Sequence, residues 1–197
     1  MGYDAIVLAS ASARRSQLLD QIGVRHRIVA ADIDEAPRAG EQPADYVSRL
    51  AAGKAEAVVA TVGGRPEIPV LAADTTVVLG NRLFGKPEGE AGCIEMLTAL
   101  AGRTHEVLTA VALWHDGRLG RVLSTSRVAF RDIGADECRR YWASGEPAGK
   151  AGAYAIQGLG AVFVERLEGS FTGVMGLPLF ETAALLDAAG VRRWLSP

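Results

Sequence analysis

The stretch AIVLASASARRSQLLDQIG, residues 5–23, decides the fold class of this chain. Its first five residues form a short apolar run bounded by small polar residues, which is typical of a buried strand. In its second half Leu18, Leu19 and Ile22 recur at helical spacing. Ser12 stands where a helix N-cap is expected, and Gly23 stands where the helix should stop. A strand, a serine-rich turn and a helix in this order predict the opening of an α/β protein.

Outward from this stretch, strand-like and helical patterns follow one another without an internal repeat, a low-complexity tract or a long linker. Gly63-Gly64 is expected to end the next helix, and Gly80-Asn81 is typical of a hairpin turn. We expect one domain over residues 1–197, with an α/β (α+β) mixed sheet wrapped by helices and a cleft between two lobes. Strands are predicted at 27–30, 69–73, 76–79, 106–114, 121–130, 158–166 and 173–175, and helices at 44–62, 88–100, 136–144 and 178–189.

Composition and charge narrow the class of function. The formal net charge is -2 and the pI is near 5.9, which argues against broad binding to nucleic acid or to an anionic membrane. Only two cysteines occur, without metal-ligand spacing, which indicates a reducing compartment. Neither a signal peptide nor a membrane-spanning run is apparent, so we expect a cytoplasmic protein that acts on a small molecule.

The turn between the first strand and helix is a candidate anion site. The N–H groups at a helix start carry partial positive charge, and Arg14 and Arg15 add planar forks that grip phosphate oxygens. Ser10 contributes a hydroxyl to the same turn. The alternative is an ordinary capped surface helix with two solvated arginines.

A second candidate site centres on Asp74, which interrupts the apolar run AADTTVV. A lone buried charge would cost several kcal/mol unless paired, and a carboxylate at a strand end can hold Mg²⁺ or accept a proton from water. Glu35, in the acidic segment 32–35, offers a further oxygen ligand. Lys54 and Lys86 are cations suited to phosphate, although each alone is typical of an ordinary surface charge.

The glycine-rich segment 150–160 supplies a third candidate. Glycines permit close approach of backbone to a ligand, and the amide of Gln157 carries both a donor and an acceptor that can read the edge of a base. The alternative is a plain connector to the next strand. His105 has no partners at metal-ligand spacing and is interpreted as structural. Together, these cations, carboxylates and one amide predict a pocket for a nucleotide polyphosphate.

Four motifs in order resemble the Maf family of nucleotide pyrophosphatases over nearly the whole length: LASASARRSQLL (8–19), AADTTVV (72–78), FGKP (84–87) and AYAIQGLGAVFVERLEGSFTGVMGLPL (153–179). The resemblance implies a fold like that of the inosine-triphosphate pyrophosphatases. It also implies hydrolysis between the α and β phosphates with Mg²⁺ or Mn²⁺. The family's turn usually reads SxSPRR with Gly in its second place, whereas this chain has Ala11 and Ala13. Ala11 stiffens the turn and Ala13 loses the preset φ of proline at the helix start, but neither removes a functional group.

The resemblance also assigns roles to residues. Asp74 falls on the catalytic acidic residue, and it shares the metal with Glu35. Lys54 and Lys86 match catalytic cations of the cleft. Ser10, Arg14 and Arg15 fall on the phosphate-binding turn, and Arg14, Thr75 and Gln157 fall on the positions that separate the family's branches; here they match the dTTP/UTP branch.

Other readings of the same residues stay open. They are a 7-methyl-GTP pyrophosphatase, a housecleaning enzyme acting on modified pyrimidine nucleotides, and a non-catalytic nucleotide-binding regulator, since the family is associated with septum formation and arrest of cell division. The family resemblance also makes a homodimer the expected assembly.

Overall fold

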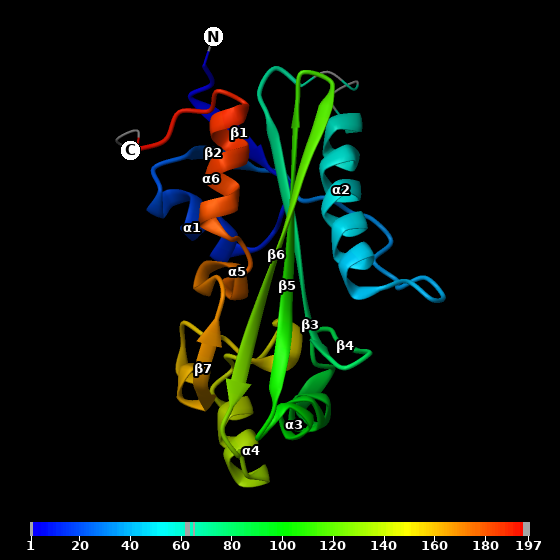
Figure 1. The fold of residues 1–197 in the computed structure, drawn as a ribbon, viewed down its shortest axis with the longest axis vertical. Helices are drawn as coiled ribbons and strands as arrows, with labels where there is room; N and C mark the ends of the chain where they lie inside the picture. The colour runs from blue at the N-terminus through cyan, green and yellow to red at the C-terminus, as the bar shows by residue number, and fades with distance from the viewer. Residues whose placement is uncertain (1, 62–63, 65, 195–197) are drawn as a thin grey trace. The chain divides into compact units, whose positions relative to one another are not determined.

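The computed structural model describes residues 2–61, 64 and 66–194, and within them the chain forms a mixed α/β fold (Figure 1). The strands are β1 Ala5–Leu8, β2 Arg25–Ile28, β3 Val70–Leu79, β4 Arg82–Phe84, β5 Thr104–His115, β6 Arg118–Phe130 and β7 Val164–Glu168. The helices are α1 Ala13–Gln21, α2 Pro43–Thr61, α3 Gly89–Leu100, α4 Ala135–Ala143, α5 Phe171–Met175 and α6 Leu179–Ala188, with 3₁₀ turns η1 Ala151–Ala153 and η2 Leu159–Phe163. The strands form one mixed sheet in the order β2-β1-β3-β5-β6-β7, and β4 pairs with β3. The predicted fold class is therefore confirmed.

The chain divides into two compact units. The first unit comprises Met1–Asp74, Thr109–Ser124 and Gly176–Pro197, and the second comprises Thr75–Leu108 and Thr125–Met175. Strands β3, β5 and β6 contribute residues to both units. The single domain and the cleft between lobes stay predictions.

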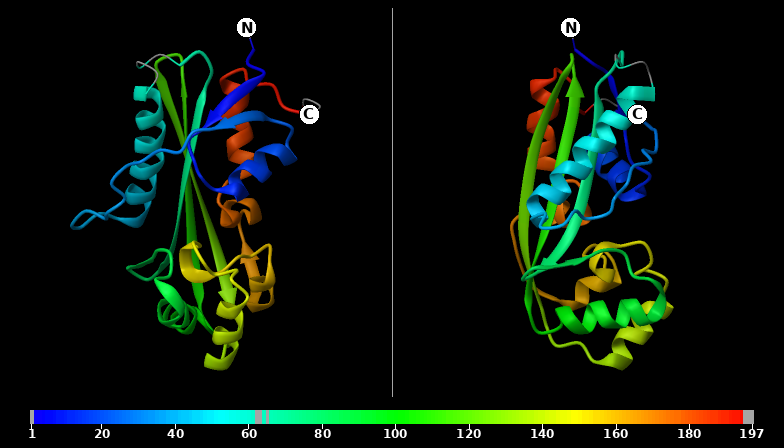
Figure 2. Two further views of the ribbon diagram at one scale, coloured as in Figure 1. Left: turned by 180° about the vertical axis from the view of Figure 1, so that it is seen from behind. Right: turned by 90° about the vertical axis from the view of Figure 1, so that its right-hand side faces the viewer.

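The first unit is built around the strand–turn–helix opening. Strand β1 runs parallel to β2, from Ala5 opposite Arg25 to Leu8 opposite Ile28, and it is also parallel to β3. Parallel neighbours need a crossover connection, which α1 provides between β1 and β2. The views in Figures 1 and 2 agree that α2 and α6 lie on opposite faces of the sheet. The predicted apolar stripe of α2 is buried, at Val47, Leu50, Ala51, Ala55 and Val58.

The second unit has a core rich in aromatic rings. Rings of Phe130, Tyr154 and Phe163 pack edge-on or tilted, and α3 and α4 pack against each other over the same cluster. The hairpin of β3 and β4 is antiparallel and turns at Gly80, whose φ of 60° favours glycine, as the Gly80-Asn81 pattern predicts. On the other side, β7 is antiparallel to β6, with Val128 opposite Leu167.

Several predicted elements change when the fold is known. The two strands expected at 69–73 and 76–79 are one strand, β3, which runs through Asp74. The strand predicted at 158–166 is wrong over its first half, because residues 159–163 form η2 and only 164–166 belong to β7. The strand predicted at 173–175 is also wrong: these residues lie in α5, where the hydroxyl of Ser170 accepts the N–H of Gly173 and caps the helix start.

The remaining predicted elements agree within a few residues at their ends. Ser12 is the N-cap residue of α1, and Gly23 follows the helix with a φ of 63°. Val62 and Gly63, where the second predicted helix was expected to end, lie outside the described residues. In the part of the chain that the structure describes, no helix combines the length and the apolar character needed to cross a membrane.

Candidate active site

The turn after β1 holds Arg15 in a fixed position in the first unit. Arg15 is 9% exposed; its Nε donates to the carbonyl of Gly176 at 2.8 Å and its Nη1 donates to the hydroxyl of Ser10 at 3.1 Å. The same hydroxyl accepts the N–H of Ser12 at 3.2 Å. Helix α1 starts directly after this turn, so its first N–H groups and the anchored guanidinium concentrate positive charge at one place.

Asp74, Lys54 and Glu35 form a linked set of charges in the same unit. Asp74 on β3 is 8% exposed and Lys54 on α2 is 9% exposed. The Nζ of Lys54 lies 2.7 Å from Oδ1 of Asp74 and 2.6 Å from Oε1 of Glu35. One ammonium therefore joins two carboxylates, which offsets the cost of burying charge at this position.

The two arginines of the turn differ in their surroundings. Burial lowers the pKa of Arg15, while the negative charges of Asp74 and Glu35 oppose this shift. Burial also lowers the pKa of Arg14, which is half-buried. Both guanidiniums stay charged at neutral pH because their ordinary pKa is far above it. The electrostatic influence of Asp74 and Glu35 on Arg15 links the turn to the carboxylates.

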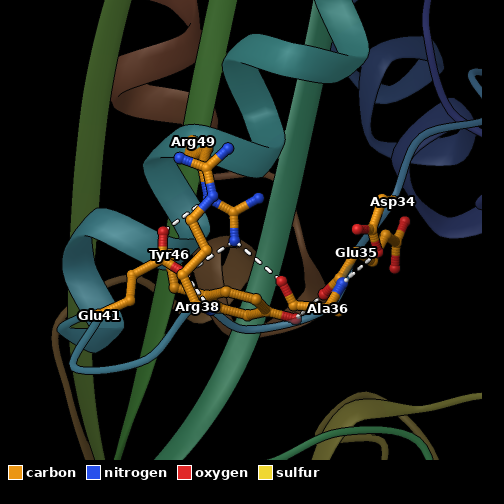
Figure 3. Close-up of polar contacts among 7 residues, drawn as sticks. All are labelled: Asp34, Glu35, Ala36, Arg38, Glu41, Tyr46 and Arg49. Carbon is orange, nitrogen blue, oxygen red and sulfur yellow. Dashed lines mark hydrogen bonds and ion pairs between the residues drawn. The ribbon is translucent and has the colours of Figure 1, made fainter.

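The loop that carries Glu35 is held onto α2 by residues that the sequence analysis missed (Figure 3). Tyr46 donates its hydroxyl to the carbonyl of Glu35 at 3.0 Å. Arg49 donates to both carboxylate oxygens of Glu41, at 2.6 and 2.7 Å, and to the carbonyl of Ala36 at 3.1 Å. The signal that could have found this pair is its spacing: Tyr46 and Arg49 lie three residues apart, on one face of a helix close to the acidic segment.

The second unit contains the other three predicted residues. Thr75 follows Asp74 in β3 and is half-buried, whereas Lys86 and Gln157 are exposed. The N–H of Gly152 donates to the carbonyl of Gly85 at 3.0 Å, so the FGKP loop and the glycine-rich segment are in contact. Gly152 has a φ of 68°, and a Cβ there would come within 2.9 Å of Val77. Only glycine suits this contact.

The first unit thus brings together Ser10 with Arg15, and Glu35 with Lys54 and Asp74. The two carboxylates supply hard oxygen donors of the kind that Mg²⁺ and Mn²⁺ prefer, and Mg²⁺ sites commonly use one or two carboxylates plus substrate phosphates. In residues 2–61, 64 and 66–194 no group of three or more His, Cys, Asp or Glu side chains has the geometry of a metal site. The donor set therefore fits a metal shared with a phosphate-containing substrate, and it does not form a closed site built from protein ligands.

Comparison with known proteins adds independent information. A family model described as "Maf-like protein" matches residues 5–189. The chain is 51% identical to the dTTP/UTP pyrophosphatase of Methylococcus capsulatus, covering 94% of this chain and 91% of that one. It is 51% identical to the protein of the same name from Nitrosomonas europaea (95% and 96% covered) and 52% identical to that from Cupriavidus pinatubonensis (96% and 99%). Among solved structures, the Ham1 protein of Staphylococcus aureus aligns at 14% identity with a TM-score of 0.45, covering 65% of this chain and 72% of that one.

Proposed function

The chain belongs to the Maf-like protein family, and we propose that it is a nucleoside triphosphate pyrophosphatase acting on dTTP and UTP. The reaction adds one water across the bond between the α and β phosphates. It yields the nucleoside monophosphate and pyrophosphate. The proposed substrates are those in the names of relatives that match this chain along more than nine-tenths of its length.

The observation that carries the proposal is the position of Lys54 between Asp74 and Glu35. A pure binding site for an anion needs cations and N–H groups, and carboxylates placed beside them would repel the ligand. A hydrolase needs a group that accepts the proton of the attacking water. We assign that role to Asp74, whose carboxylate is fixed by the Nζ of Lys54 at 2.7 Å.

The cations and polar groups take the remaining roles. Arg15, held by Gly176 and Ser10, keeps its charge in one position without reorganisation, which is the condition for stabilising charge that develops on phosphate oxygens. Arg14 binds phosphate from the same turn. Lys54 and Lys86 stabilise negative charge on the transferred and departing phosphates. Thr75 and Gln157 select the pyrimidine base.

We also propose dependence on Mg²⁺ or Mn²⁺. Asp74 and Glu35 would hold the ion together with the substrate's phosphates. When bound, the ion neutralises phosphate charge and lowers the pKa of a coordinated water.

The test is release of pyrophosphate from a panel of dTTP, UTP, dCTP, dGTP and 7-methyl-GTP, with Mg²⁺, with Mn²⁺ and with chelator. Asp74→Asn is nearly isosteric, and we expect it to lower turnover of dTTP by about a hundredfold or more. The matched control is Asp187→Asn, which removes an exposed carboxylate paired with Arg193 and should leave turnover unchanged.

Each other outcome assigns a different function. Turnover of 7-methyl-GTP in preference to dTTP would place the chain in the other enzymatic branch. Binding of nucleotides without hydrolysis in the presence of metal would favour a regulator of cell division. Near-full activity of Asp74→Asn would remove Asp74 from the mechanism. The proposal includes a cytoplasmic homodimer, and sedimentation of the purified protein tests the assembly.

A further inference from the structure

Gln157 lies at the tip of a tight turn in the second unit. The N–H of Gly158 donates to the carbonyl of Ala155 at 3.2 Å, which closes a turn with Ile156 and Gln157 at its centre. Ile156 is 6% exposed and packs into the aromatic core, whereas Gln157 is exposed. The turn therefore presents one polar side chain outward from an apolar base.

Tyr141 and Glu146 hold this turn on both sides. The hydroxyl of Tyr141 accepts the N–H of Ala155 at 3.1 Å and donates to Oε1 of Glu146 at 2.7 Å. The carboxylate of Glu146 then accepts the N–H of Gly160 at 2.9 Å and that of Leu159 at 3.0 Å. Two side chains from the end of α4 and the loop after it thus bind the backbone before and after Gln157. We refer to Tyr141 and Glu146 together as the turn clamp.

The glycines of the turn are explained by the turn clamp. A Cβ on Gly158 would lie 2.0 Å from a carboxylate oxygen of Glu146, and a Cβ on Gly160 would lie 2.6 Å from the hydroxyl of Tyr141 and 2.9 Å from the carbonyl of Ala155. Neither contact is possible without movement. The two glycines of the AIQGLG sequence therefore leave room for the side chains of Tyr141 and Glu146. In an ordinary connector, glycine would be needed only for its backbone flexibility.

The charge of Glu146 is supported by the same contacts. Burial acts to raise the pKa of Glu146, but the hydrogen bonds from Tyr141, Gly160 and Leu159 outweigh it, and the pKa is lowered. Burial raises the pKa of Tyr141, and its bond to Glu146 adds to the increase. At neutral pH the clamp is thus an ionised acceptor with a neutral donor, which gives stronger hydrogen bonds than a neutral pair.

We propose that Glu146 and Tyr141 are positioning residues that set the enzyme's pyrimidine preference by fixing the backbone from which the Gln157 amide extends. This inference rests on the role given to Gln157 in the proposed function. A site that reads a base edge by hydrogen bonds discriminates only when its donor and acceptor are held in place. An amide on a free loop shifts with its backbone, and the turn clamp removes that freedom by holding the backbone before and after Gln157.

The experiment compares Glu146→Gln and Tyr141→Phe with two matched controls from the same unit. Glu137→Gln removes a carboxylate that pairs with Arg131, and Tyr154→Phe removes a buried hydroxyl that contacts His105 instead of the turn. Each protein is assayed for kcat and KM on dTTP and dGTP, and for binding of both nucleotides in chelator, where no turnover complicates the measurement. Thermal unfolding reports stability.

We expect both clamp variants to raise the KM for dTTP by about tenfold, which corresponds to the loss of one well-placed hydrogen bond. Turnover at saturation should change little, and the values for dGTP should stay as in the unchanged protein. The preference for dTTP over dGTP should therefore fall about tenfold. The controls should lose stability without losing preference, which separates positioning from a general weakening of the core.

A double-mutant cycle with Gln157→Ala decides whether the clamp acts through Gln157. The Glu146→Gln, Gln157→Ala protein should show no lower preference than Gln157→Ala alone. Additive losses, or a preference unchanged in both clamp variants, would overturn the inference.

The proposed function and this inference can fail separately. If the unchanged protein binds dTTP in preference to dGTP but hydrolyses neither, and the clamp variants lose that preference, the pyrophosphatase assignment falls and the clamp stands. If the unchanged protein hydrolyses dTTP and the clamp variants keep the full preference for dTTP, the pyrophosphatase assignment stands and the role of the clamp falls. Binding of both nucleotides with equal affinity and equal turnover overturns the role of the clamp.

Discussion

The two units of this chain differ in the polar groups that they bury: charged side chains in the first unit and neutral ones in the second. Among the described residues, every buried Arg, Lys or Asp lies in the first unit: Arg15, Lys54 and Asp74. The second unit instead buries neutral groups, His105 and the hydroxyls of Tyr141 and Tyr154, within an aromatic cluster.

The difference indicates a division of labour. Charges that are buried and paired are costly, so a fold retains them where reaction chemistry needs fixed charge. The hydroxyls of Tyr141 and Tyr154 add hydrogen bonds to an aromatic core without themselves being buried charges. Under the proposed function, the first unit supplies most of the reacting charges, Lys86 of the second unit adds one more, and the second unit carries the residues that select the base.

The largest expected effect comes from removing a charge of the first unit. We expect Lys54→Met to lower pyrophosphate release from dTTP by about a hundredfold or more, because fixed positive charge is lost. It should also destabilise the fold by about 3 kcal/mol, because Asp74 stays buried without its ammonium. Urea unfolding measures the second effect. Adding Asp74→Asn to Lys54→Met should restore stability but not activity; full activity of the single variant would break the comparison between the units.

The second prediction concerns acid and the core of the second unit. Burial lowers the pKa of His105 from 6.5 to about 4. Its Nε2 lies 3.0 Å from the hydroxyl of Tyr154, its ring packs edge-on against Phe130, and its Nδ1 has no hydrogen-bond partner in the described part of the chain. A protonated ring would have no acceptor for its second N–H.

The sign follows from the lowered pKa. The unfolded chain takes up the proton near pH 6.5 and the folded chain only near pH 4. The contribution of His105 to the free energy of unfolding is therefore fully present above pH 6.5. It is lost as pH falls to about 4, and the loss is about 3 kcal/mol in all. Urea unfolding measures the free energy of unfolding at pH 7 and at pH 4. The decrease between the two pH values should be smaller by this amount in His105→Gln than in the unchanged protein. If NMR shows the imidazole of His105 titrating near pH 6.5 in the folded protein, the prediction is refuted.

A third prediction tests whether shape is the property that the second unit protects. Gly160→Ala places a methyl group against Tyr141 and the backbone of Ala155, and we expect a loss of about 1 to 3 kcal/mol. The matched control is Gly92→Ala, inside α3, where the new Cβ meets nothing closer than 3.8 Å. It should stabilise the protein by about 0.5 to 1 kcal/mol. Equal effects of the two substitutions in urea unfolding would contradict the steric argument.

The smallest effect is expected at the loop that carries Glu35. The hydrogen bonds from Arg49 are the main reason that the pKa of Glu41 is lowered from 4.5 to about 2. The contribution of Glu41 to the free energy of unfolding is present above pH 4.5 and is lost as pH falls through about 2. This range extends well below the one in which His105 titrates. Titration of the Glu41 carboxyl by NMR should give a midpoint near pH 2, and Arg49→Met should move this midpoint toward pH 4.5. A midpoint already near 4.5 in the unchanged protein would mean that the ion pair does not hold the loop in solution.

Much of the fold could be predicted because its signals are local. Gly23 and Gly80 act on their immediate neighbours, and the stripe along α2 follows from helical spacing alone. The predictions failed at 159–163 and 173–175, where backbone hydrogen bonds override the apolar pattern. The N–H groups of Leu159 and Gly160 bind Glu146, which is more than twelve residues away in the chain.

The candidate site was predictable in its residue types and less so in its supports. Lys54 taken alone was typical of an ordinary surface charge, and the structure places it in contact with Asp74. The supports of Glu35 and of the Gln157 turn, Arg49 and Glu146, have no motif of their own. An arginine or glutamate on a helix or loop resembles any surface charge until its partner is known.

By itself, the sequence determined the α/β class and the family, and it named the side chains proposed to react, because these depend on patterns between near neighbours and on short motifs. Only the tertiary structure decided which charges are paired and which backbone segments are held. Arg15 bonds to Gly176 and Lys54 to Asp74, across 161 and 20 residues of chain. Such contacts form when packing brings distant segments together, and the exclusion of water at the packed site is what makes pairing there necessary.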